Sequence, residues 1–387
     1  MPEVCRMYRV LKNCVTLLIL PVLLIVSVPE LPVHAEISVS AKACILIEAS
    51  TGRVLFEKNA QEKLPMASTT KIMTTLLTIE SGDLDTEFMV NNQAIHVEGS
   101  SMGLQENDIV TKRALCYGML LPSGNDAANA SAVAVAGSIP AFARLMNQRA
   151  EKIGMTRTCF VTPSGLEGTG HGASASDMAL LTREALQNQI FREICSQASA
   201  VVKFGNPPYE RRLYNSNKLL GMYDGVIGVK TGFTDEAGRC LVSACERDGV
   251  TLICVTLNDR DDWNDHMQLY DYGFSQISPV TLEIPEITQN LAGSTQEKIR
   301  LRIEQPVVIG TVNQDVSEIS YKILLSPFAC APVRDGEELG RLEYYFRDQK
   351  ICSCPLLADG SAEAKISPEK SKFMQFLDTL RKIIRNA

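Results

Sequence analysis

A serine and a lysine spaced three residues apart begin an apolar, helix-forming stretch, at Ser68 and Lys71 in "MASTTKIMTTLL". Residues three apart lie on one face of a helix, so this hydroxyl and this amine can meet. Serine is a weak nucleophile unless a base takes its proton, and lysine can act as that base only when it is neutral. The alternative is that Ser68 only caps the helix and that Lys71 is a solvated side chain. A second Ser-x-x-Lys, Ser367 to Lys370 in "SPEK", is typical of such a cap, because a proline follows its serine.

Two further motifs bring more polar side chains into consideration. Ser123 and Asn125 form a Ser-x-Asn motif in "LLPSGND", and residues 230–232 form Lys-Thr-Gly in "GVKTGFT"; each pattern occurs once in the chain. In this order, the three motifs are those of penicillin-binding proteins and β-lactamases. In these enzymes the serine of the first motif attacks the substrate and becomes acylated. The combination therefore favours nucleophilic catalysis over helix capping and ordinary turn chemistry.

With these motifs the chain resembles the serine-type D-alanyl-D-alanine carboxypeptidases, the low-molecular-mass penicillin-binding proteins. The resemblance covers about residues 41–275 and includes "DGVIGVKTGFTDEAG" and "SASDMALL". It implies an enzyme that removes the terminal D-alanine from peptidoglycan stem peptides, that is acylated by β-lactam antibiotics, and that needs no metal or organic cofactor. One departure is Phe233, because some relatives carry histidine after Lys-Thr-Gly.

The resemblance also implies a role for each residue. Lys71 would be the base that activates Ser68, kept neutral by burial and by the nearby charge of Lys230. Ser123 would relay a proton to the leaving amine, and Asn125 would bind the peptide backbone. The remaining substrate contacts would come from one strand: Lys230 and Thr231 at the terminal carboxylate, Gly232 beside them, and the backbone N–H of Phe233, with that of Ser68, in the oxyanion hole.

Other functions remain open at this stage. A class A β-lactamase would need a glutamate in Glu-x-x-Leu-Asn, and the nearest stretch, "EALQN" from Glu184, has the wrong spacing and lies in an expected helix. A D,D-endopeptidase would share every residue named above. A non-catalytic penicillin-binding wall protein is disfavoured by the intact motifs. None of the four histidines has a recognisable Ser/His/Asp arrangement.

Composition limits the location and the partners. Basic residues precede an apolar run from Cys14 to Val28 that ends in small residues at Ala35, which is typical of a signal peptide over residues 1–35. The chain is therefore expected outside the cytoplasm. Its formal net charge of −7 argues against nucleic acid as a partner. Most of its 12 cysteines stand singly in apolar contexts, typical of buried side chains, although a disulfide remains possible.

The apolar pattern predicts an α+β domain over residues 36–278. Two strands are expected around a turn at residues 49–52, then a helix from Ser68, and a turn between two helices at residues 122–124. A helix is expected over residues 177–189, followed by three strands, the last two joined at residues 247–249. Together they predict a penicillin-binding or β-lactamase-like domain, with an antiparallel sheet of about five strands, flanking helices and a helical subdomain.

Two smaller parts are expected to follow. Residues 279–366 show short alternating segments with little helical period, which predicts a small all-β domain. Residues 367–387 place large apolar side chains on one helical face among five basic residues. This pattern predicts an amphipathic helix that attaches the protein to a membrane surface, although docking on the protein itself is the alternative.

Overall fold

The computed structural model describes residues 37–365 and 376–377. The expected signal peptide lies outside these residues, and so does the expected C-terminal helix apart from two residues. Within the described part of the chain, no helix is both long enough and apolar enough to cross a bilayer.

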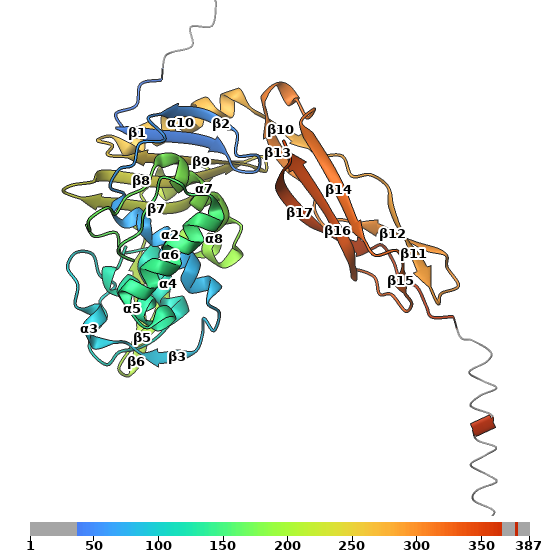
Figure 1. The fold of residues 1–387 in the computed structure, drawn as a ribbon, viewed down its shortest axis with the longest axis horizontal. Helices are drawn as coiled ribbons and strands as arrows, with labels where there is room; N and C mark the ends of the chain where they lie inside the picture. Colours follow the sequence, from blue (N-terminus) through green and yellow to red (C-terminus); the bar gives the residue numbers. More distant parts are fainter. Residues whose placement is uncertain (1–36, 366–375, 378–387) are drawn as a thin grey trace, which may run out of the picture. The chain divides into compact units, whose positions relative to one another are not determined.

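The central element is a five-stranded antiparallel sheet with the strand order β2-β1-β9-β8-β7 (Figure 1). Its strands are β1 (Ala43–Glu48), β2 (Val54–Lys58), β7 (Val226–Thr234), β8 (Gly238–Arg247) and β9 (Val250–Leu257). All six residues of β1 are buried, because helices cover both faces of the sheet. Helix α10 (Asp262–Gln276) packs on one face, and α7 (Ala175–Leu186) packs on the other. The predicted antiparallel sheet is confirmed, and the Lys-Thr-Gly motif lies on its edge strand β7.

The helical subdomain lies beside this sheet and shares its apolar core. It consists of α2 (Lys71–Glu80), α4 (Lys112–Leu120), α5 (Asn125–Ala136), α6 (Ile139–Ile153) and α8 (Gln189–Cys195), with a short α3 (Asn92–Ile95). The sequence of α5, "NDAANASAVAVA", is rich in alanine, and these small side chains let α5 pack closely against its neighbours α2, α4 and α6. The predicted turn at residues 122–124 joins α4 to α5 as expected.

Several elements differ from the prediction. The helix expected from Ser68 starts as a 3-10 turn, η1 (Ala67–Thr70), and becomes α-helical only at Lys71. A four-stranded sheet was not foreseen: β3 (Glu87–Met89), β4 (Ile109–Thr111), β5 (Ser199–Gly205) and β6 (Pro208–Tyr214), with the short α9 (Leu219–Met222) after it. Helix α10 was missed as well, because its buried side chains include Asp262, Asp265 and His266, which disguise the apolar period.

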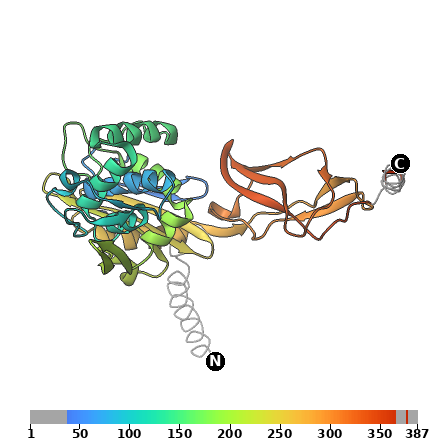
Figure 2. The same cartoon turned by 90° about the horizontal axis from the view of Figure 1, so that it is seen from below.

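Residues 278–364 form strands with an apolar core of their own, in orange to red in Figure 2. A two-stranded sheet pairs β10 (Ser278–Thr281) with β13 (Val308–Thr311). The six-stranded sheet has the order β14-β16-β17-β12-β11-β15, from β11 (Ile287–Ala292), β12 (Lys298–Arg302), β14 (Ile319–Leu325), β15 (Ala329–Cys330), β16 (Glu338–Phe346) and β17 (Gln349–Ala358). This part has no α-helix between residues 278 and 365, in agreement with the all-β prediction.

Candidate active site

Ser68 lies in η1, between the edge strand β7 and the start of α2. The preceding Ala67 has a positive φ of 46°, a conformation that costs energy for a residue with a side chain and that often marks functional sites. Ser68 does not cap the helix, since no side chain accepts a capping hydrogen bond at the start of α2. Instead its Oγ accepts a hydrogen bond from Lys71 Nζ at 2.9 Å.

Lys71 is fully buried and donates two further hydrogen bonds, each of 2.7 Å, to Asn125 Oδ1 and to the carbonyl oxygen of Ser164. All three of its acceptors are neutral. Burial lowers the pKa of Lys71 well below its ordinary value, the positive charge of Lys230 lowers it further, and Asp126 partly opposes the shift. Lys71 is therefore poised to be the neutral amine that a base requires.

The carbonyl of Ser164 reaches Lys71 because the chain passes very close to η1 at the next residue. A Cβ atom on Gly165 would lie only 1.9 Å from the carbonyl oxygen of Ala67, and Gly165 has a φ of +88°. Only glycine fits this position, for reasons of both space and backbone conformation. The close approach thus fixes one wall of the Lys71 site.

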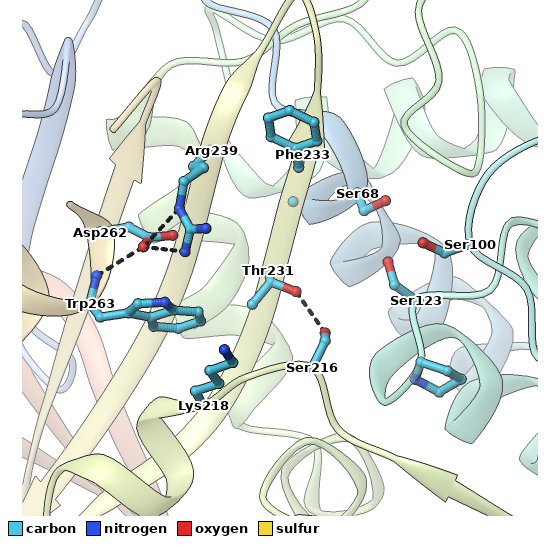
Figure 3. Close-up of a pocket in the computed structure, with 12 residues that line it drawn as sticks. Ser68, Ser100, Ser123, Ser216, Lys218, Thr231, Phe233, Arg239, Asp262 and Trp263 are labelled. Carbon is cyan, nitrogen blue, oxygen red and sulfur yellow. Dashed lines mark hydrogen bonds and ion pairs between the residues drawn. The ribbon is translucent and has the colours of Figure 1, made fainter. Parts of the chain in front are cut away.

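Ser123 stands on the turn between α4 and α5 with a positive φ of 66°. Its hydroxyl has no hydrogen-bond partner within the described residues, and it lines the same pocket as Ser68. Figure 3 shows the hydroxyls of Ser68, Ser123 and Ser100 converging on one part of this pocket. The turn therefore presents Ser123 to whatever binds beside Ser68.

Asn125 follows on the first turn of α5 and is 4% exposed. Its Oδ1 accepts from Lys71, and its Nδ2 donates to the carbonyl oxygen of Glu98 at 2.6 Å. Both ends of the side-chain amide are thus engaged within the protein, and Asn125 does not line the pocket. The geometry makes it a positioning residue for Lys71, whereas the predicted contact with the substrate backbone remains a prediction.

Asp126 holds the loop that carries Ser100 at the edge of the pocket. Its carboxylate accepts hydrogen bonds from the Ser101 hydroxyl and from the backbone N–H groups of residues 102, 103 and 104. The backbone N–H of Asn125 donates to the Ser100 carbonyl at 2.7 Å. Sequence reasoning missed both Ser100 and Asp126, although an acidic residue in the first turn of a helix is a recognisable anchor.

Lys230 is 1% exposed, and its Nζ donates to the backbone carbonyl of Thr231 at 2.7 Å. Burial lowers its pKa to about 7. Thr231 shares a 2.7 Å hydrogen bond with the Ser216 hydroxyl and faces the pocket. Lys230 is on the same face of β7 as Gly232, which lies against Ser68, and its charge acts on Lys71. Of the two predicted carboxylate ligands only Thr231 borders the pocket, although Lys230 Nζ lies 3.5 Å from Thr231 Oγ1.

Gly232 lies against the nucleophile. A Cβ atom there would be 3.1 Å from the Ser68 backbone nitrogen and 3.2 Å from Ala67 Cβ, which is tighter than ordinary packing. The absence of a side chain lets β7 approach η1, so Ser68 and Phe233 border one pocket. The Phe233 side chain itself is 64% exposed.

The pocket that these residues line has a volume of about 360 Å³. Besides Ser100 and Pro122, five further residues of the pocket were not predicted as site residues: Ser216, Lys218, Arg239, Asp262 and Trp263. They come from α10, from β8 and from the segment after β6 (Figure 3). These three segments are more than 20 positions apart in the sequence and carry no shared motif, so only the fold brings them together.

Other reactive side chains lie outside this pocket. His266 contacts Ser243 Oγ at 2.6 Å, but both are fully buried, and burial lowers the pKa of His266 to about 3. All ten cysteines of the described residues are free, six of them buried, which agrees with their predicted role as small apolar side chains. The described residues contain no cluster of His, Cys, Asp and Glu that could hold a metal ion.

Comparison with known proteins identifies the family of this chain. The profile of the D-alanyl-D-alanine carboxypeptidase family matches residues 30–261. The D-alanyl-D-alanine carboxypeptidase DacF of Bacillus subtilis is 31% identical over 357 residues, covering 89% of this chain and 90% of DacF.

Solved structures agree with this result. The D-alanyl-D-alanine carboxypeptidase DacD of Francisella tularensis has a TM-score of 0.58 and 29% identity over 86% of this chain and 95% of DacD. Penicillin binding protein 5 of Haemophilus influenzae has a TM-score of 0.60 and 25% identity over 84% of this chain and 98% of that protein. The chain belongs to the D-alanyl-D-alanine carboxypeptidase family of serine peptidases.

Proposed function

We propose that the chain removes the terminal D-alanine from peptidoglycan stem peptides through an acyl-enzyme on Ser68, and that β-lactams acylate the same serine. One observation carries this proposal: Ser68 Oγ lies 2.9 Å from Nζ of a fully buried lysine that has no carboxylate partner. A serine beside a neutral amine, at the wall of an open pocket, is the arrangement that covalent acyl transfer requires.

In the first step, Lys71 takes the proton of Ser68 as Oγ bonds to the carbonyl carbon of the penultimate D-alanine. The C–N bond then breaks, and the leaving nitrogen takes up a proton through Ser123, so that free D-alanine departs. Water next attacks the ester carbon, the bond from that carbon to Oγ breaks, and the shortened peptide leaves as a carboxylic acid while Ser68 Oγ regains a proton. Ser123 lines the pocket beside Ser68 with a hydroxyl that has no partner within the described residues, which supports its role as the relay.

The backbone N–H groups of Ser68 and Phe233 are proposed to bind the oxyanion. Their support is the close approach of Gly232 to Ser68, which brings the two backbones to one side of the pocket. Removing one such donor costs about 2.7 to 4 kcal/mol in other acyl-transfer enzymes. Thr231 would bind the terminal carboxylate, and Lys230, whose Nζ lies 3.5 Å from Thr231 Oγ1, would add its positive charge there.

The rival functions fit less well. Glu184, the residue closest to a β-lactamase glutamate, lies in α7 and pairs with Arg149 at 2.6 Å, away from the residues that line the pocket. An endopeptidase acting on cross-linked peptides would use the same residues, so substrate tests must separate it from a carboxypeptidase. A non-catalytic role would not explain why a lysine is buried beside the Ser68 hydroxyl.

The proposal also includes the location of the enzyme. Residues 1–35 would direct export, residues 36–278 would form the catalytic domain, and residues 279–366 would form a β domain. The separate apolar core of the strands between residues 278 and 364 supports this division. Residues 367–387 would then attach the exported enzyme to the anionic membrane surface.

The decisive experiment is mass spectrometry of the purified protein after treatment with penicillin. We expect one covalent adduct, mapped by peptide analysis to Ser68, together with release of D-alanine from a D-Ala-D-Ala peptide by the untreated enzyme. An adduct on another residue, or none on the wild type, would refute the proposal.

A further inference from the structure

A buried side chain holds the residue before the nucleophile in a costly backbone conformation. Ala67 has a φ of 46°, in the left-handed region that residues with a Cβ atom rarely adopt. Its carbonyl oxygen accepts a hydrogen bond of 2.8 Å from Oγ1 of Thr70, which is completely buried. A threonine hydroxyl has one proton to donate, so this bond forms only when the proton points toward Ala67. The group that fixes the direction of this hydroxyl therefore also holds Ala67.

The ring of His171 fixes that direction. Nδ1 of His171 lies 3.0 Å from the backbone nitrogen of Val161, whose N–H can only donate, so Nδ1 is an acceptor. A neutral imidazole with an accepting Nδ1 carries its proton on Nε2. Nε2 lies 2.9 Å from Thr70 Oγ1 and therefore donates to it. The proton of the Thr70 hydroxyl is then free to point to the Ala67 carbonyl.

His171 is neutral at physiological pH and its position is fixed. Burial lowers the pKa of His171 to about 4, and the positive charge of Lys63 acts in the same direction. The two residues after His171 form β-bridges with Cys159 and Leu64, and Phe160 contacts the imidazole edge-on. The three hydrogen bonds therefore run in one direction, from a backbone N–H through the ring and the hydroxyl to the Ala67 carbonyl.

This chain of hydrogen bonds acts on Ser68 through a peptide bond. The Ala67 carbonyl and the Ser68 N–H belong to one planar trans peptide group, in which they point in opposite directions. A hydrogen bond that fixes the carbonyl therefore also fixes the N–H, which is the proposed oxyanion donor. The Ser68 nitrogen lies close to β7, since a Cβ atom on Gly232 would be only 3.1 Å from it. Rotation of this peptide would thus turn the donor away from the oxyanion.

We propose that His171 is a positioning residue, which sets the plane of the Ala67–Ser68 peptide through the Thr70 hydroxyl and thereby aims the Ser68 N–H at the oxyanion. The proposal rests on the function proposed above and extends it to a residue outside the three sequence motifs. Neither His171 nor Thr70 lines the pocket, so neither is expected to contact the substrate. The hydrogen bonds of Lys71 do not include them, so proton transfer does not pass through them.

Variants of Thr70 test the role of the hydroxyl. Stopped-flow acylation by a β-lactam separates the dissociation constant of the first complex from the rate constant of acylation. Thr70→Val has nearly the same shape but no hydroxyl. We expect its acylation rate constant to fall about 10- to 100-fold, while the dissociation constant changes less than about 3-fold, because only the oxyanion donor is misplaced. Thr70→Ser keeps the hydroxyl and should recover most of the rate.

The matched control is Thr78→Val. It removes another fully buried threonine hydroxyl, which donates to the Thr74 carbonyl within α2 at 2.7 Å and has no link to Ser68. This control should lose a similar hydrogen bond but acylate at the wild-type rate. Equal rate constants for Thr70→Val and Thr78→Val would overturn the proposal.

Two amide side chains at residue 171 separate the donor of the ring from its acceptor. The side-chain nitrogen of glutamine is as many bonds from Cα as Nε2 of histidine, so His171→Gln keeps a donor for Thr70. The side-chain oxygen of asparagine corresponds to Nδ1, so His171→Asn keeps only the acceptor for Val161. We expect the acylation rate constant of His171→Gln to stay within about 5-fold of the wild type and that of His171→Asn to fall about 10- to 100-fold.

This comparison excludes a role that is only structural. If residue 171 merely stabilised its own loop through the Val161 N–H, His171→Asn would acylate at least as fast as His171→Gln, and that order would contradict the inference. Thermal unfolding shows which variants are folded at the assay temperature. If Thr70→Val does not fold, the order of the two variants at residue 171 decides the proposal alone.

A double variant tests whether the two residues act as one chain. His171→Asn combined with Thr70→Val should acylate about as slowly as the slower single variant, because either change breaks the same series of hydrogen bonds. Losses that multiply would count against the inference.

The wild type distinguishes the two proposals. If it forms no penicillin adduct on Ser68 and releases no D-alanine, the proposed function fails. If it is labelled and active while its acylation rate does not depend on the hydroxyl at residue 70, only the inference fails.

Discussion

The side-chain oxygen of Asn125 lies 2.7 Å from Nζ of Lys71, and the same amide is tied at its other end to the Glu98 carbonyl. Three segments of the chain therefore meet at this amide: the start of α2, the start of α5 and the loop at residue 98. The acceptors around Lys71 are neutral groups, which orient the amine without favouring its charged form. This explains how the site combines a fixed lysine with a lowered pKa.

Replacing Asn125 by aspartate tests this arrangement. Asn125→Asp would place a carboxylate against Lys71, stabilise its protonated form and raise its pKa. We expect acylation by a β-lactam at pH 7 to slow by at least about 10-fold and to recover toward alkaline pH. The rate should be measured by stopped flow from pH 6 to 10. A rate that falls equally at every pH would indicate that Asn125 acts mainly by contacting the ligand.

Replacing Lys71 by arginine tests the base directly. Lys71→Arg keeps a cation but removes any usable base, since arginine does not lose its proton. Acylation should slow by about 10² to 10⁴, the usual effect of losing a general base. Rapid quench with a β-lactam measures this rate. Acylation near the wild-type rate would show that another group takes the proton of Ser68.

A methyl group at Gly232 should separate β7 from the nucleophile. In Gly232→Ala the new Cβ would lie 3.1 Å from the Ser68 nitrogen, so the strand or η1 must shift by a few tenths of an ångström. We expect acylation to slow by about 10- to 100-fold, because misplacement of this size near the reacting atoms is costly. Gly221→Ala is the matched control, since no atom lies within 4 Å of the position of its Cβ. Equal rates for the two variants would contradict the crowding argument.

Truncation before residue 367 tests the predicted membrane attachment. If residues 367–387 bind an anionic surface, the protein without them should leave the membrane fraction and remain in the supernatant. Its kcat/KM on a soluble D-Ala-D-Ala peptide should not change. Sedimentation with vesicles that contain anionic lipid measures the first effect. A truncated protein that still sediments would place the attachment elsewhere in the chain.

The parts of the fold with strong local patterns were predictable from the sequence. The apolar runs of β1, β8 and β9 and the turns between elements identified the five-stranded sheet, because burial and turn chemistry act over a few residues. Helix α10 was missed because His266 and Asp265 occupy core positions there. These polar side chains are buried with partners on β9, β8 and the chain near Ser40, and such long-range hydrogen bonds leave no local pattern.

For the site, the motifs identified the residues but not their surroundings. Lys71 hydrogen-bonds to Ser68, and Ser123 lines the same pocket as Ser68, while their catalytic roles stay predictions. Arg239 and Asp262 could not be foreseen, because their meeting depends on the register of β8 and on where α10 begins. The buried position of Lys230, on the same face of β7 as Gly232, likewise depends on the strand register, because a shift of one residue would turn its side chain to the other face.

Finally, the burial of Lys230 should lower the free energy of unfolding at pH values where its amine is protonated, and this effect can be measured. Its pKa is about 7 in the folded protein and 10.5 as the ordinary value, so the unfolded chain binds more protons between these limits. The free energy of unfolding contributed by this group therefore rises with pH from about 7 to 10.5, and below pH 7 the group destabilises the fold by at most about 5 kcal/mol. Lys230→Met, which fills similar space without a charge, tests this.

We expect the Lys230→Met variant to be more stable than the wild type at pH 6, with the difference in free energy of unfolding shrinking toward pH 10, while its activity on D-Ala-D-Ala peptides is strongly reduced. Urea unfolding at several pH values measures the difference directly, because titrations shared by both proteins cancel. A variant that is less stable than the wild type at pH 6, or a difference that does not depend on pH, would show that Lys230 keeps its proton and is stabilised by its surroundings.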